Sequence, residues 1–269
     1  MNADYYYDQG LTFAVKGEMD EAVKSFREAI RLEPSMAPAY HQLGKVFLKM
    51  GRFKEAVETL REAINRRPQQ TSVQVDLGFA YLGAGEIELA QDAFISALAI
   101  SENNVRALNG LSAIFFRQEQ WDRLRAHADA ALALSPDNFA ALFYRGCAAY
   151  RLGDFATGET VFDRAEAVLD ELLNIQPSSV AVHYLLGEIK RYRGSYGTAQ
   201  EHFLEAKRLC SLDQTYTAYG ISFSGLDVLV QLGMCYMNLS KPERAAEIAE
   251  EIRAVDPDHP AIETLTKTE

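Results

Sequence analysis

Apolar residues recur along the chain at intervals of three and four, the spacing that places one face of an α-helix against a core. In residues 37–70, Leu43 and Phe47 belong to one such stripe and Leu60 to a second, and Gly51 lies between the two stripes. Pro68 follows the second stripe, and proline cannot continue a helix. The pattern therefore predicts two amphipathic helices joined by a short turn at Gly51.

Small residues lie where these two helices would meet. Gly44 belongs to the first predicted helix, and Ala56 and Ala63 belong to the second. A missing or short side chain lets two helices approach closely. One hairpin of this size cannot bury its own apolar face, so we expect each hairpin to stack on the next.

The same pattern returns at intervals of about 34 residues over nearly the whole chain. The fifth copy is longer by about seven residues, or two helical turns, which predicts a lengthened second helix that stops before Pro177. We expect seven hairpins, an insertion and a partial capping helix, with the bounds 3–36, 37–70, 71–104, 105–138, 139–179, 180–213, insert 214–225, 226–259 and cap 260–269.

The motif Tyr40-x-x-Leu43-Gly44-x-x-Phe47, followed by Ala56-x-x-x-Leu60 and Pro68, resembles the tetratricopeptide-repeat (TPR) pattern, with substitutes at its aromatic places. This resemblance implies an all-α fold, a right-handed superhelical solenoid of antiparallel helix hairpins that forms a single domain over residues 1–269. It also implies that the first helices line a concave groove and that the second helices form the convex back.

The net charge of the chain argues against some classes of partner. Lys and Arg number 27 against 38 Asp and Glu, which gives a formal net charge of −11. Nucleic acid and anionic membranes need a basic surface, so we expect neither as a partner.

The sequence has no leader-like start and no apolar run of about 18 residues, so we expect no membrane insertion and a cytoplasmic location. Three widely spaced cysteines, Cys147, Cys210 and Cys235, favour buried thiols in a reducing compartment.

No pattern of residues indicates a catalytic site or a metal site. The five histidines form no HxxxH or HExxH pair, and the acidic residues are scattered as helix-surface charge. His127 and His202 occupy the same place in two repeats, and we expect both to be solvated at an outer edge. The sequence therefore predicts a non-catalytic protein without a cofactor or a metal site.

The groove-facing places of the first helices are the best candidates for contact with a partner. Repeats four to six place aromatic residues beside arginines there, and these residue types dominate binding hot spots. Alternatively, the aromatics fill gaps between neighbouring helices and the arginines pair with local acids. The predicted contact residues are Arg106, Asn109, Phe116, Arg117, Phe143, Tyr144, Tyr150, Arg151, Tyr184, Arg191 and Tyr192.

The insertion before the seventh hairpin is a second candidate. It carries Tyr216, Tyr219 and Phe223 among small and polar residues. Insertions in repeat proteins often lie on the binding face. The alternatives are a linker, or an extra turn at the start of the next helix whose aromatics cover the lengthened helix.

These observations predict a scaffold or adaptor that captures a segment of another protein in its groove. Aromatic and arginine side chains suit a segment with apolar anchors and some acidic groups. Self-assembly through groove-to-end contacts is one alternative, and a regulatory or assembly factor for a larger complex is another. An enzyme is the reading that the sequence favours least.

Overall fold

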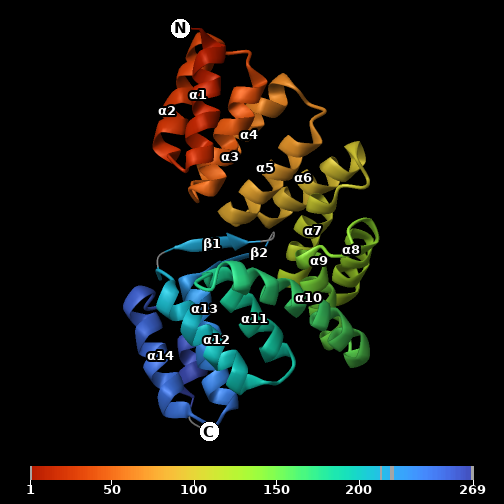
Figure 1. Ribbon diagram of the computed structural model, residues 1–269, viewed down its shortest axis with the longest axis vertical. Coiled ribbons are helices and arrows are strands. Elements are labelled where there is room, and N and C mark those ends of the chain that lie inside the picture. Colours follow the sequence, from red (N-terminus) through yellow and green to blue (C-terminus); the bar gives the residue numbers. More distant parts are fainter. Residues whose placement is uncertain (1, 213, 219–220, 268–269) are drawn as a thin grey trace. The chain divides into compact units, whose positions relative to one another are not determined.

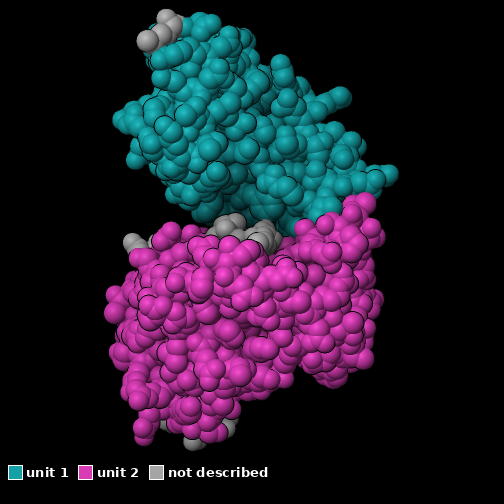
Figure 2. All heavy atoms as spheres, in the orientation of Figure 1, with its two compact units in different colours: residues 1–118 teal, residues 119–269 magenta. Residues whose placement is uncertain are grey.

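The computed structural model describes residues 2–212, 214–218 and 221–267, and helices make up most of it (Figure 1). The chain divides into two compact units, residues 1–118 and 119–269 (Figure 2). The all-α class predicted from the sequence is confirmed, since tandem pairs of helices account for nearly every element.

Over its described residues, unit 1 contains antiparallel helix hairpins followed by one further helix. Its elements are α1 (Ala3–Lys16), α2 (Met19–Leu32), α3 (Ala37–Lys49), α4 (Phe53–Arg66), α5 (Thr71–Ala84), α6 (Ile87–Ile100) and α7 (Val105–Arg117).

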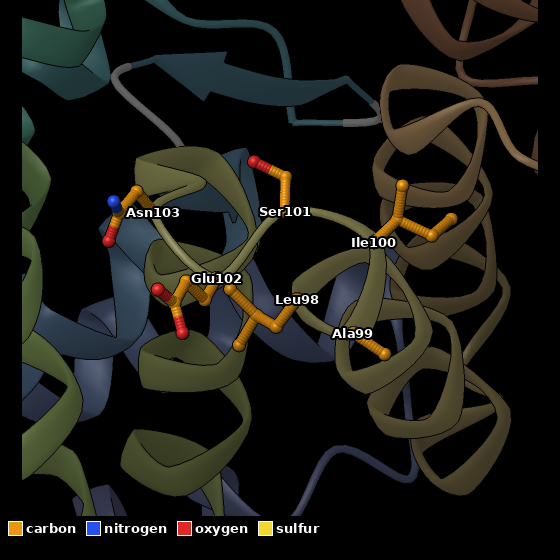
Figure 3. Close-up of a pocket in the computed structure, with 6 residues that line it drawn as sticks. All are labelled: Leu98, Ala99, Ile100, Ser101, Glu102 and Asn103. Atoms are coloured by element: carbon orange, nitrogen blue, oxygen red, sulfur yellow. The ribbon is translucent and has the colours of Figure 1, made fainter.

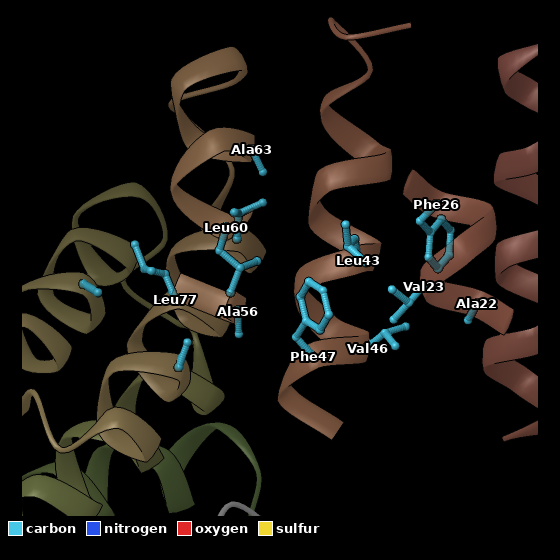
Figure 4. Packing of buried hydrophobic residues seen from close by; sticks show 13 residues of the cluster. Ala22, Val23, Phe26, Leu43, Val46, Phe47, Ala56, Leu60, Ala63 and Leu77 are labelled. Carbon is cyan, nitrogen blue, oxygen red and sulfur yellow. The ribbon is translucent and has the colours of Figure 1, made fainter. Parts of the chain in front are cut away.

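Neighbouring hairpins of unit 1 share one continuous apolar core (Figure 4). Figure 4 shows Val46 of α3 directed towards Val23 of α2, so the core passes from one hairpin to the next. The fully or nearly fully buried members include Phe26, Phe47 and Leu60. Because each hairpin covers the apolar face of its neighbour, the stacking expected from the sequence holds within the unit.

Unit 2 contains further helix pairs and a small strand pair. Its elements are α8 (Trp121–Leu134), α9 (Phe139–Arg151), α10 (Phe155–Ile175), α11 (Val180–Tyr192), α12 (Tyr196–Leu209), β1 (Thr215–Ala218), β2 (Ile221–Ser224), α13 (Gly225–Asn238), α14 (Pro242–Val255) and α15 (Ala261–Thr266).

Helix α10 is the lengthened second helix predicted from the repeat spacing. It has 21 residues, whereas α12 and α14 have 14 each. Leu169, in the added part, is fully buried, so the added turns continue the apolar stripe. The helix ends at Ile175, two residues before Pro177, as expected from the missing N–H of proline.

The insertion differs from both conformations expected for it. It is neither a linker nor an extra helical turn, because β1 and β2 pair as an antiparallel hairpin in which Tyr216 lies opposite Phe223. A capping box then starts α13: the Ser224 side chain accepts from the Asp227 backbone N–H, and the Asp227 side chain accepts from the Ser224 N–H. The strand pair is therefore fixed to the first turn of the following helix.

Close contact between the helices of a hairpin depends on a glycine of the first helix. In the fifth hairpin, a Cβ atom at Gly146 of α9 would lie 2.3 Å from a ring carbon of Phe162 in α10. The expectation for Gly44 is confirmed in the same way, since its Cβ would lie 2.5 Å from Leu60. A methyl group at these positions would have to displace a fully buried side chain.

Gly146→Ala should therefore lower the stability of the protein. Overpacking a well-filled core costs on the order of 1–3 kcal/mol, which exceeds the gain of up to about 1 kcal/mol in helix propensity. Gly197→Ala in α12 is the matched control, because a Cβ at Gly197 would meet no atom within 4 Å. Urea unfolding followed by circular dichroism measures both variants, and a Gly146→Ala protein as stable as the control would contradict the packing argument.

Candidate functional site

Four of the predicted contact residues come together at the carboxyl ends of α9 and α11. Tyr150 and Arg151 end the first of these helices, and Arg191 and Tyr192 end the second. The rings of Tyr150 and Tyr192 have centroids 6.4 Å apart, and the guanidinium carbons of Arg151 and Arg191 lie 6.0 and 4.7 Å from the Tyr192 ring centroid. These four residues are named the arginine–tyrosine cluster.

Arg151 is the exposed cation of this cluster. Its guanidinium carbon lies 5.2 Å from the ring of Trp121 in α8, so the side chain contacts two aromatic faces. No carboxylate of the described residues forms an ion pair with Arg151. Contacts of this kind are worth about 0.5–1 kcal/mol at exposed sites and leave the N–H groups available to a ligand.

A buried carboxylate holds Arg191 in place. Glu188 is only 4% exposed, and its two oxygens accept hydrogen bonds from Nε and Nη2 of Arg191 at 3.2 and 2.9 Å. Burial opposes the charge of Arg191, but the Glu188 carboxylate outweighs it and raises the pKa of the guanidinium. The planar, two-point pairing fixes the orientation of Arg191.

The phenol groups of the cluster remain protonated near neutral pH. Burial and a hydrogen bond to Glu159 raise the pKa of Tyr150 to about 12, and burial also raises the pKa of Tyr192. At neutral pH both tyrosines are hydrogen-bond donors with aromatic faces. This chemistry suits recognition of a ligand better than transfer of a proton.

The other predicted contact residues of unit 2 are buried. Phe143 and Tyr144 are each 3% exposed, and the Phe143 ring packs against Tyr144 and against Phe162 of α10. Tyr184 of α11 is 8% exposed. In this structure these three side chains fill the space between elements, as in the packing alternative considered from the sequence.

The predicted residues of unit 1 have different environments. Arg106 of α7 has a side chain that is 59% exposed, and its Nη2 donates to Asp76 of α5. Arg117 is exposed and Phe116 is half-buried, whereas Asn109 is buried. The prediction left out Asp76 as a contact residue, although it occupies a groove-facing place of its repeat.

Phe223 of the insertion packs inside unit 2. Its ring stacks on Tyr184 with a centroid distance of 3.9 Å and an angle of 7°. The ring of Tyr216 also stacks on Phe223, with a centroid distance of 5.5 Å. Tyr219, the third predicted residue of the insertion, lies outside the described residues. The insertion is therefore attached to α11 through a series of three rings.

The base of this strand pair is closed by backbone contacts. A Cβ atom at Gly225 would lie 2.5 Å from the carbonyl oxygen of Ser211 and 2.6 Å from Cα of Leu212. The Gly225 N–H also donates to the Gln214 carbonyl. Only glycine permits the two segments to pass this closely.

A surface hollow of about 560 Å³ lies beside the turn from α6 to α7 (Figure 3). It is lined by Leu98, Ala99, Ile100, Ser101, Glu102 and Asn103. A single carboxylate in an open hollow offers no set of ligands and no acid–base pair. Across the described residues, no group of three His, Cys, Asp or Glu side chains is arranged to hold a metal ion.

None of the helices in the described ranges combines the length and the apolar character needed to cross a membrane.

His183 and His202 form a pair that the sequence spacing did not indicate. Their Nδ1 atoms are 3.3 Å apart, and Nε2 of His183 lies 3.0 Å from the Pro177 carbonyl oxygen. The carbonyl can only accept, so Nε2 of His183 carries a hydrogen; when both rings are neutral, Nδ1 of His183 accepts from Nδ1 of His202. The expectation that His202 would be a solvated edge residue is therefore wrong, because it is half-buried and paired.

The histidine pair should make stability depend on pH. Burial, with contributions from His183 and Lys190, lowers the pKa of His202 in the folded protein. The unfolded chain then binds more protons, so this contribution is present above the unfolded pKa of about 6.5 and is lost as the pH falls through the folded pKa. His202→Gln should flatten the dependence of unfolding free energy on pH below about 6.5, whereas His127→Gln should keep it. Equal pH profiles for the two variants would contradict this assignment.

Removing the central ring of the three-ring stack should destabilise unit 2. Truncating a buried phenylalanine costs about 3–5 kcal/mol, so Phe223→Ala should lower the melting temperature markedly. Tyr216→Ala removes a half-buried ring and should lower it less. Calorimetric melts of the two variants measure the difference, and an unchanged melt for Phe223→Ala would show that the stack is dispensable.

Comparison with protein families identifies the repeat. A TPR repeat model matches residues 10–51, and tetratricopeptide repeat models match residues 37–70, 75–138, 114–167 and 227–259. No curated protein matches the sequence significantly.

Solved structures with the same fold have low sequence identity to this chain. A tetratricopeptide repeat protein from Parabacteroides merdae is 16% identical, with a TM-score of 0.65 over 98% of this chain and 97% of its own. The structure titled APC/C hetero-tetramer Cut9-Hcn1 is 16% identical, with a TM-score of 0.70 over 98% of this chain and 54% of its own. MamA from Desulfovibrio magneticus is 21% identical, with a TM-score of 0.56 over 65% of this chain and 96% of its own. Together with the helix hairpins and the glycine contacts, these matches show that the chain belongs to the tetratricopeptide-repeat family.

Proposed function

We propose that this protein is a non-catalytic interaction scaffold that captures a segment of another protein, with the arginine–tyrosine cluster as the principal contact of unit 2. The observation that carries the proposal is the state of Arg151, which is exposed, lies against the rings of Trp121 and Tyr192, and has no ion pair with a described carboxylate. An arginine oriented by aromatic faces is a frequent hot spot in protein interfaces.

The cluster favours a partner segment with two kinds of group. The faces of Tyr150 and Tyr192 suit an apolar or aromatic anchor, because they supply contact area with little loss of side-chain freedom. The guanidinium of Arg151 suits a carboxylate, which it can bind through two parallel hydrogen bonds. A short acidic and apolar segment satisfies both.

The proposal includes no catalytic step. The raised pKa values of Tyr150, Tyr192 and Arg191 keep these three groups protonated near neutral pH, which suits hydrogen-bond donation to a ligand better than proton transfer. The three cysteines are free thiols, which suits the reducing environment of the cytoplasm.

Arg151→Glu should weaken partner capture by about tenfold or more, because the carboxylate of the segment would meet a like charge. The melting temperature should change little, since the side chain is exposed. Arg61→Glu is the matched control, because Arg61 is exposed on α4 and has no ion pair among the described residues. Affinity purification from source lysate, followed by quantitative mass spectrometry, compares the wild-type protein with both variants.

A protein depleted with Arg151→Glu but retained with Arg61→Glu would be the expected partner. If both variants retain the same proteins as the wild type, the cluster has a packing role and the proposal fails. Self-assembly is distinguished by light scattering of the purified protein, because a mass that rises with concentration and falls with Arg151→Glu would identify a second copy of this chain as the occupant.

A further inference from the structure

Unit 1 contains a buried carboxylate that joins three successive first helices. The side chain of Asp76 in α5 is 3% exposed, and it accepts hydrogen bonds from Nε2 of His41 in α3 at 2.8 Å and from Nη2 of Arg106 in α7 at 2.7 Å. Burial opposes ionisation of Asp76, but the two basic partners outweigh it and hold the pKa of the carboxyl below its usual range. The carboxylate is thus charged, and it aligns two basic side chains from either side.

The contact with Asp76 engages only part of the Arg106 guanidinium. One of its nitrogens donates to Asp76, while the side chain as a whole is 59% exposed. Its guanidinium carbon lies 5.5 Å from the ring of Phe79, which is half-buried and packs against Phe94 of α6. Arg106 therefore has a fixed orientation, an aromatic surface beneath it and N–H groups that face away from Asp76.

Two lysines of α3 extend the basic surface. Lys45 and Lys49 follow His41 at spacings of four and eight residues, which places all three on one stripe of the helix. Lys45 is half-buried and Lys49 is exposed, and in the described part of the chain neither forms an ion pair.

The two lysines without an ion pair and the exposed guanidinium of Arg106 form a local basic surface on a protein of net charge −11, and such a surface favours a ligand of opposite charge. We propose that His41, Lys45, Lys49 and Arg106 form a binding face for an acidic peptide segment of a partner protein, and that Asp76 positions this face. Phe79 provides a contact for one apolar residue within the segment.

This inference extends the proposed scaffold function to unit 1. Its test uses a synthetic peptide and variants of unit 1, so its failure would leave the result for Arg151 unaffected. Likewise, loss of the proposed partner of Arg151 would not change peptide binding to unit 1.

The probe is a fluorescein-labelled, end-blocked peptide of ten residues composed of Glu and Asp with one central Leu, and fluorescence anisotropy measures its binding to the full chain. The comparison peptide carries Gln and Asn in place of the acids. At about 0.1 M salt, charges beyond about 10 Å are largely screened, so binding reports the local face. We expect the acidic peptide to bind at least tenfold more tightly than its amide counterpart.

The variant Lys45→Glu, Lys49→Glu should weaken acidic-peptide binding at least tenfold. Lys54→Glu, Arg61→Glu makes the same change of charge at exposed positions of α4 that form no ion pair among the described residues, and it should weaken binding less than twofold. Both double variants alter solvent-accessible side chains, and thermal melts verify that they fold. Equal losses in the two double variants would show that total charge governs binding and would overturn the proposal.

The variant Asp76→Asn distinguishes two effects of Asp76: its positioning of Arg106 and His41, and its own negative charge. Removing a negative charge from a basic face should strengthen binding of an acidic peptide if only electrostatics mattered. If Asp76 positions Arg106 and His41, the same change should weaken binding several-fold. Tighter binding to Asp76→Asn would overturn the positioning role. Absence of any preference for the acidic peptide, or tighter binding of a ten-nucleotide single strand, would overturn the binding face.

Discussion

The close approach of two helices at a glycine is the constraint on which the hairpins depend. Phe162 lies on the backbone of α9 at Gly146, and Leu60 lies on the backbone of α3 at Gly44. Dispersion contacts and burial of a large side chain are gained only when the facing Cβ is missing. Once the two helices are locked at this distance, their remaining apolar stripe is directed to the next hairpin, and stacking follows.

Buried carboxylates give the first helices their fixed basic groups. Asp76 in unit 1 and Glu188 in unit 2 are both nearly inaccessible, and each pairs with an arginine that has access to solvent. Burying a charge is costly, and such pairs often contribute little to stability. In both units the arrangement instead restricts the orientation of an arginine on a first helix, which reduces the loss of freedom when a ligand binds.

The features that could be predicted from the sequence are those whose interacting residues lie close together along the chain. The hairpins and the lengthened α10 follow from spacings within about 40 residues, because small residues, stripes and prolines have local meanings. The grouping of Tyr150, Arg151, Arg191 and Tyr192 followed from equivalent places in neighbouring repeats. The His41–Asp76–Arg106 link joins residues 35 and 30 positions apart, and no single-residue pattern distinguishes it from surface charge. The strand pair was not predicted, although Ile221-Ser222-Phe223-Ser224 alternates apolar and polar residues. The alternation covers only four residues, and the helical repeats on both sides favoured a linker or an extra helical turn.

The added length of α10 has a consequence for how such chains can change by insertion. Seven residues span nearly two complete turns, so the apolar stripe rotates by only about 20° between the start and the end of the added segment. Leu169 consequently still faces the core. An insertion of one or two residues would instead rotate the following residues by about 100° or 200° and turn them away from the core. Second helices of this architecture should therefore tolerate growth by seven residues far better than growth by one or two.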